Sequence, residues 1–140
     1  MARDAFEGSV VHLLHTAAQV ADGAFNRAVR GITPRQFTIL KAVATSEGLS
    51  QTDVMRATGI DRSTVSSMTR GLATRGYLAR KRTKGDARTY AVRLTDAGRQ
   101  ELDRAGPIAK KVEIVLLKQL QIRERAQFLK LLEAFATNAS

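Results

Sequence analysis

Residues 50–94 read SQTDVMRATGIDRSTVSSMTRGLATRGYLARKRTKGDARTYAVRL. Polar capping residues and glycines divide this stretch into two short helices, over about 51–58 and 62–75, joined by a turn that contains Gly. Two strands follow, at about 77–82 and 88–94, around a turn rich in Gly and Asp. The stretch therefore predicts a helix-turn-helix followed by a β-hairpin, or wing.

Two helices are expected before this stretch. Apolar residues recur at steps of three and four from Phe6 to Ala28, which predicts a long amphipathic helix that Gly31 ends. The apolar face of this helix is wider than one small core usually buries. Thr33 and Pro34 then mark the start of a second helix, because Thr can cap it and Pro suits its first position.

Two further helices are expected after the hairpin. Thr95 caps a long helix, which Gly106-Pro107 should kink because Pro lacks the backbone donor. A final helix covers about residues 123–136 and carries an apolar side. The fold class is mainly α (α+β): a winged helix-turn-helix between long terminal helices, in a single domain over residues 1–140.

The positive charge is concentrated in the helix-turn-helix and wing. From Arg56 to Arg93 the chain has ten basic and two acidic residues, a balance of +8, against +10 for the whole chain. The remaining residues are close to neutral. Because each Lys or Arg near a phosphate releases condensed counterions, this concentration favours a polyanionic partner over general solubility.

The second helix of the pair has two different faces. Val65, Met68 and Leu72 line one of them and are expected to point into the core. A solvated face would usually carry Glu, Lys and Gln, which favour helices, whereas Ser and Thr disfavour them. Small hydroxyls with one Arg favour contact with bases and phosphates instead. The opposite face carries Ser63, Ser66, Ser67, Arg70 and Thr74, with Arg62 and Thr64 on its flanks.

The hairpin tip, residues 84–88, is the second candidate element for DNA contact. Arg88 is predicted to enter the minor groove, where a narrow A·T-rich groove attracts Arg. Asp86 could hold its guanidinium in position, although a polar surface turn is the simpler alternative. The basic run 80–82 suits phosphate contact. As an alternative, some of its members serve only to keep the edge strand from pairing with another strand.

Other classes of protein receive little support from the residues. The chain has no Cys, no P-loop, no Gly-rich dinucleotide turn and no HExxH motif, which disfavours an enzyme. His12 and His15 are the only histidines, and their row resembles a polar helix face more than a metal site. We expect no metal, no cofactor and no membrane span, and a cytoplasmic location.

The stretch from about Thr33 to Gly98 resembles the MarR family of bacterial winged-helix regulators. The wing and the return strand are the most specific part of this resemblance, and the flanking helices match in order and length. The matching residues are Gln51 to Thr58, Ser63-Thr64-Val65-Ser66, Leu72 to Arg80, Asp86-Ala87-Arg88 and Val92 to Gly98.

The resemblance implies a homodimer joined through helices in residues 5–30 and 99–137, with a DNA-binding region over 33–98. It implies a regulator, usually a repressor, that binds pseudo-palindromic double-stranded operators and that a small ligand can release from DNA. Chains that sense oxidants through a thiol differ from this one, which has no Cys. The predicted DNA contacts are Ser50, Gln51, Arg62, Ser63, Thr64, Ser66, Ser67, Arg70, Arg80, Arg82, Lys84, Asp86 and Arg88.

Two alternatives stay open at this point. A nonspecific or architectural DNA-binding protein without effector sensing would keep the charge but would not need the hydroxyl-lined face. A winged helix used for protein contact would show no strong salt dependence of DNA binding. Gly71, inside the second helix, either allows a close approach to DNA or is merely tolerated there.

Overall fold

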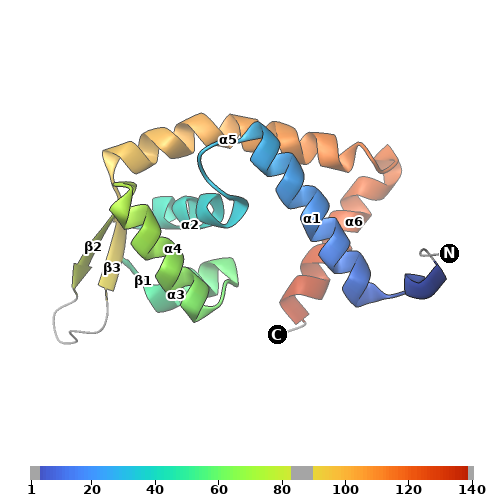
Figure 1. The fold of residues 1–140 in the computed structure, drawn as a ribbon, viewed down its shortest axis with the longest axis horizontal. Coiled ribbons are helices and arrows are strands. Elements are labelled where there is room, and N and C mark those ends of the chain that lie inside the picture. Colours follow the sequence, from blue (N-terminus) through green and yellow to red (C-terminus); the bar gives the residue numbers. More distant parts are fainter. Residues whose placement is uncertain (1–3, 83–89, 139–140) are drawn as a thin grey trace.

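Figure 1 shows the fold in the computed structural model, which describes residues 4–82 and 90–138. The predicted order of helices and hairpin is confirmed, with one short strand added before the helix-turn-helix. The elements are the 3-10 helix η1 (Asp4–Phe6), α1 (Val10–Ala28), α2 (Pro34–Thr45), β1 (Leu49–Ser50), α3 (Gln51–Thr58), α4 (Arg62–Thr74), β2 (Leu78–Arg82), β3 (Tyr90–Leu94), α5 (Asp96–Leu117) and α6 (Ile122–Asn138).

The predicted caps stand at the starts of four helices. Thr33 and Ser50 each form a capping box with the residue three positions later, Gln36 and Asp53 respectively. Asp61 caps α4, because its carboxylate accepts a hydrogen bond of 3.0 Å from the backbone N–H of Thr64. Thr95 caps α5 in the same way.

The first helix is shorter than predicted. Phe6 belongs to η1, and α1 begins only at Val10, because Gly8 has a φ of +76° and Ser9 caps the helix. The helix also ends earlier than expected, at Ala28, before Gly31 is reached. The apolar stripe that starts at Phe6 therefore spans two helices with a turn between them.

The strand before α3 was not predicted. β1 pairs with β3, and β3 pairs with β2, to make an antiparallel sheet in the order β1-β3-β2. Leu49 lies opposite Val92, and Leu78 lies opposite Leu94. The pairing joins the strands of the hairpin to the residues that directly precede α3.

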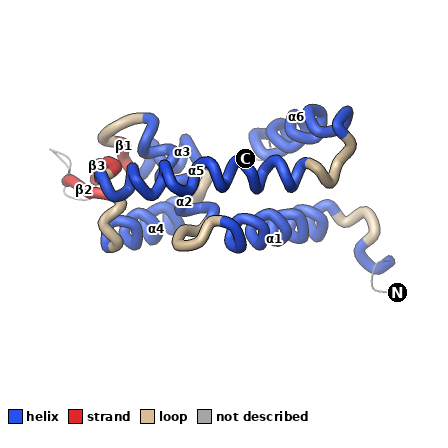
Figure 2. The backbone as a smooth tube through the Cα atoms, turned by 90° about the horizontal axis from the view of Figure 1, so that it is seen from above, coloured by secondary structure: helices blue, strands red, loops and turns tan. Residues whose placement is uncertain are grey.

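The core lies between the winged helix and the long helices. Its fully buried members come from α2, α3, α4, β3 and α5 and from the turn after α1, and they include Ile39, Leu40, Val54, Leu72 and Val92. Helix α5 runs from the sheet to the turn before α6 in Figures 1 and 2 and continues through Pro107 as one helix. It therefore connects the winged helix at one end with α1 and α6 at the other.

The start of α5 packs closely on the turn before β2. Thr95 donates a hydrogen bond of 2.6 Å to the carbonyl of Gly76. A Cβ atom at Gly98 would lie 2.1 Å from the carbonyl oxygen of Tyr77 and 2.8 Å from Leu94. Only a glycine fits at this position, so the backbones of α5 and the turn approach directly.

Helices α1 and α6 leave large apolar faces uncovered. They cross in Figure 1 but lie on opposite sides of α5 in Figure 2. No residue of α6 is buried. Phe128, Leu131 and Phe135 form an apolar side of this helix, and they are 43%, 61% and 49% exposed. Within the described residues no helix is long and apolar enough to cross a membrane.

Candidate nucleic-acid interface

Helix α4 separates its buried and exposed residues as predicted. Val65 and Leu72 are fully inaccessible, and Met68 packs partly against the core. Thr69 is also fully buried, which the sequence did not predict, and its hydroxyl donates to the carbonyl of Val65 at 2.8 Å. The opposite face is open to solvent and carries the exposed side chains of Arg62, Ser63, Ser67, Arg70 and Thr74.

Two of the predicted contact residues already use their hydroxyl hydrogen inside the chain. The hydroxyl of Thr64 donates to the carboxylate of Asp61 at 2.7 Å. The hydroxyl of Ser50 donates to the carboxylate of Asp53 at 2.9 Å. These hydrogen bonds lower the pKa of both carboxylates, for Asp53 after the larger effect of the Ser50 backbone N–H. Both hydroxyls can still accept hydrogen bonds from a ligand.

The basic residues of β2 divide between the two faces of the sheet. Arg80 and Arg82 share one face, and their guanidinium groups lie 5.0 Å and 5.9 Å from the ring centroid of Tyr90 on β3. Lys81 lies on the other face, because successive residues of a strand point to opposite faces and its partner is Ala91, the neighbour of Tyr90. Tyr90 thus holds two positive charges side by side, which the sequence alone did not reveal.

Five predicted contacts remain, two on helices and three in the hairpin tip. Gln51 starts α3, and Ser66 lies half-buried on α4. Lys84, Asp86 and Arg88 lie outside the described residues. The described part of the site is thus a hydroxyl-rich helix face with two arginines, together with the arginine pair of β2.

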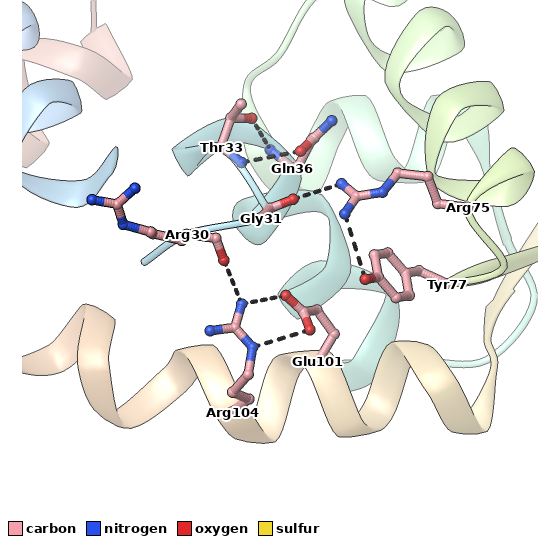
Figure 3. Close-up of polar contacts among 8 residues, drawn as sticks. All are labelled: Arg30, Gly31, Thr33, Gln36, Arg75, Tyr77, Glu101 and Arg104. Atoms are coloured by element: carbon pink, nitrogen blue, oxygen red, sulfur yellow. Dashed lines mark hydrogen bonds and ion pairs between the residues drawn. The ribbon is translucent and has the colours of Figure 1, made fainter. Parts of the chain in front are cut away.

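Arg75 is a basic residue of the charged segment that is engaged within the chain, as Figure 3 shows. Its Nη1 donates a hydrogen bond of 2.6 Å to the carbonyl of Gly31, and its Nη2 lies 3.5 Å from the hydroxyl of Tyr77. The guanidinium also lies 4.9 Å from the centroid of the Tyr77 ring. Gly31 belongs to the α1–α2 turn (residues 29–33), which is 44 positions away in the sequence.

A second arginine holds the same turn from α5 (Figure 3). Nη2 of Arg104 donates to the carbonyl of Arg30 at 2.7 Å and also binds Glu101. The hydrogen bond from Arg104 lowers the pKa of Glu101, partial burial opposes it, and the charges of Arg104 and Arg75 add to the lowering. The Glu101–Arg104 pair is local, at positions i and i+3 of α5. No local pattern predicts the contacts of the two arginines with the turn, because these partners lie 44 and 74 positions apart along the chain.

A cleft of about 560 Å³ lies between α1, α2 and α5, and two residues of α3 also belong to its lining. Phe25 and Phe37 form part of its wall, with ring centroids 5.6 Å apart. Lys41 lies over the ring of Phe37 at 6.0 Å, and the carboxylates of Asp22 and Glu113 also line the cleft. Its size and its mixed lining suit a small molecule with one aromatic ring and polar substituents.

The two histidines form no metal site with their described surroundings. The ring of His12 stacks on Phe6 with centroids 4.6 Å apart. Over residues 4–82 and 90–138, no group of three or more His, Cys, Asp or Glu side chains could hold a metal ion.

Comparison with known proteins identifies the family to which this fold belongs. Residues 30–89 match the MarR family. The HTH-type transcriptional repressor NicR of Pseudomonas putida is 30% identical over 88% of this chain and 79% of its own length. The chain spans between 62% and 94% of the length of the seven curated relatives that match it.

Solved structures agree with this assignment. BpsR of Bordetella bronchiseptica, whose DNA binding is described as regulated by 6-hydroxynicotinic acid, has a TM-score of 0.83 and 30% identity over 91% of this chain and 98% of its own. The transcriptional repressor CouR, bound to a 23-mer DNA duplex, has a TM-score of 0.83 and 28% identity over 96% of both chains. The chain is a winged helix-turn-helix transcriptional regulator. It belongs to the MarR family.

Proposed function

We propose that the protein is a homodimeric repressor that binds a pseudo-palindromic operator through α4 and the wing. The observation that carries this proposal is the open face of α4, where Ser63, Ser67 and Arg70 are exposed beside a fully buried apolar face. Small hydroxyls allow bases to approach, and Arg can bind guanine through two hydrogen bonds. In helix-turn-helix proteins the second helix lies in the major groove.

We assign DNA binding to residues 33–98 and dimerisation to residues 5–30 and 99–137. The uncovered apolar sides of α1 and α6 support the second assignment, because large exposed apolar patches mark interaction sites. The two equivalent halves of a dimer match the two halves of a palindrome.

Selection of random duplex DNA on the purified protein, at about 0.15 M salt, tests the sequence-specific part of this proposal. We expect an enriched inverted repeat with half-sites about one helical turn apart. The Arg70→Ala variant should lose the preference at one position of each half-site and cost about 1–3 kcal/mol on the preferred operator. Binding without any enriched sequence would favour the architectural alternative instead.

We further propose that a small aromatic acid occupies the cleft between α1, α2 and α5 and releases the DNA. The DNA binding of BpsR is regulated by 6-hydroxynicotinic acid, which carries a carboxylate and a ring hydroxyl. In this chain Lys41 offers a cation for a carboxylate, and Asp22 and Glu113 offer acceptors for a hydroxyl. Phe25 and Phe37 offer an aromatic wall.

Titration of 6-hydroxynicotinic acid into the protein–DNA complex tests this second step. The wild type should release DNA, and Lys41→Met should bind DNA but respond to the acid at least about tenfold more weakly, since a charged hydrogen bond is worth roughly 1.5–3 kcal/mol. Lys118→Met is the control, because Lys118 lies at the end of α5 and outside the cleft lining. A wild type that holds DNA at every concentration would refute this ligand while leaving the DNA-binding proposal intact.

A further inference from the structure

We propose that Arg75 is a positioning residue that sets the orientation of α4 against the dimerisation helices, and through it the half-site spacing that the dimer accepts. The inference rests on the proposed function, since it needs a dimer on an inverted repeat. It also removes one arginine from the set of phosphate contacts that the charge of residues 56–93 suggests.

The contacts of Arg75 support an internal role. One end of its guanidinium is bound to the carbonyl of Gly31 at 2.6 Å, and its central carbon lies 4.9 Å from the centroid of the Tyr77 ring. Its charge acts on Glu101, whose pKa it helps to lower. A side chain held on several sides in this way is not free to follow a DNA phosphate (Figure 3).

The turn that Arg75 holds is itself fixed. Val29 and Ile32 are only 1% and 4% exposed, so the turn is anchored in the core on both sides of Gly31. Gly31 has a φ of +100°, a conformation that directs its carbonyl and that other residues rarely adopt. Arg104 holds the neighbouring carbonyl of Arg30 from α5.

Three elements therefore meet at the turn: the end of α1, the C-terminal end of α4 and the side of α5. Arg75 is the C-cap of α4, so its bond to Gly31 acts at the end of the recognition helix itself. In a dimer joined through α1, α5 and α6, the tilt of each α4 decides how far apart the two recognition helices lie. Half-sites about one helical turn apart are matched only when the two recognition helices lie at a corresponding separation.

Operators that differ only in half-site spacing test this inference. Binding is measured on the selected inverted repeat and on copies lengthened or shortened by one base pair, each over a series of salt concentrations. The wild type should favour one spacing. Arg75→Gln should lose about tenfold in affinity on that spacing, the order of loss of one base contact, and less on the altered spacings. Its salt slope should be unchanged.

Three variants sharpen the comparison. Arg75→Lys keeps the charge but cannot bind Gly31 and cover Tyr77 together, so it should lose part of the spacing preference. Arg104→Gln, on α5, should relax the same preference although it lies outside the helix-turn-helix. Lys81→Gln is the control: it should weaken binding equally at all spacings and make the salt slope shallower by about one unit.

Two outcomes would overturn the inference. Equal loss at every spacing with a shallower salt slope would make Arg75 a phosphate contact. Full affinity and an unchanged spacing preference in both Arg75 variants would leave it a structural contact only. A wild type without any inverted-repeat preference would instead refute the proposed function, so the two failures are distinguishable. Circular dichroism of each variant confirms that the folded protein is compared.

Discussion

At the scale of single residues, two glycines in helices have opposite meanings. A side chain at Gly98 would meet the carbonyl of Tyr77 at 2.1 Å, and backbone cannot move aside as a side chain can. We expect Gly98→Ala to lower the free energy of unfolding by about 1–3 kcal/mol, the usual cost of overpacking. Denaturation in urea measures it, and an unchanged midpoint would contradict the close packing of α5 on the turn.

Gly71, in contrast, has nothing within 4 Å of the position that a Cβ would take. Gly71→Ala should therefore raise the free energy of unfolding by about 1 kcal/mol, the difference in helix propensity. On the face that carries Ser67 and Arg70, the new methyl group should lower DNA affinity at the same time. Gly106→Ala, in open space on α5, is the matched control and should leave DNA affinity unchanged.

The two measurements on Gly71→Ala separate the two interpretations of this glycine. Higher stability with weaker DNA binding means that the bare backbone is needed for the approach to DNA. Higher stability with unchanged binding means that Gly71 is merely tolerated.

Glu101 makes the stability of the fold depend on pH, because it pairs with Arg104, which holds the α1–α2 turn. Its pKa in the folded chain is lowered by Arg104, so its ionised form stabilises the fold above its ordinary pKa of 4.5. That stabilisation is lost as the pH falls through the lowered folded value. Glu101→Gln should be less stable than the wild type at pH 7, and the difference should shrink below pH 4.5 in thermal melts. A difference that stays constant down to pH 3 would argue against this pairing.

At the scale of elements, the sequence predicted what depends on neighbouring residues. Thr33, Ser50, Asp61 and Thr95 cap helices because a side chain meets a backbone N–H only three positions away. β1 was missed because two residues form a strand only when β3 lies beside them. The start of α1 was placed too early because the apolar period continues across the turn at Gly8.

The candidate site was predictable to a similar extent. The two faces of α4 follow from its helical period alone, and Val65 and Leu72 are buried as expected. The grouping of Arg80 and Arg82 around Tyr90 requires the register between β2 and β3, which the sequence does not give. The engagement of Arg75 requires a contact across 44 residues, which no local pattern of the sequence predicts.

At the scale of the whole molecule, α6 is the element that needs a partner most. We expect Leu131→Lys to shift the protein toward a monomer in sedimentation experiments, because it places a charge in the middle of the apolar side of α6. DNA affinity should fall with it, as two half-sites are no longer bound together.

A matched control lies on the same helix. Ala126 is exposed and lies on the side of α6 away from Leu131, so Ala126→Lys adds the same charge outside the apolar side and should remain dimeric. Ala and Lys are both good helix formers, so the helix itself should be little affected. Equal behaviour of the two variants would exclude the apolar side of α6 from the dimer interface.

The length of α5 has a mechanical consequence. A helix of 22 residues is about 33 Å long, and this one reaches from α6 to the base of the wing. A tilt of about 5° at one end displaces the other by about 3 Å, close to the rise of one base pair. In the proposed repressor, α5 would therefore act as a lever arm, since its length turns a small rotation near the cleft into a displacement of about one base-pair step at the wing.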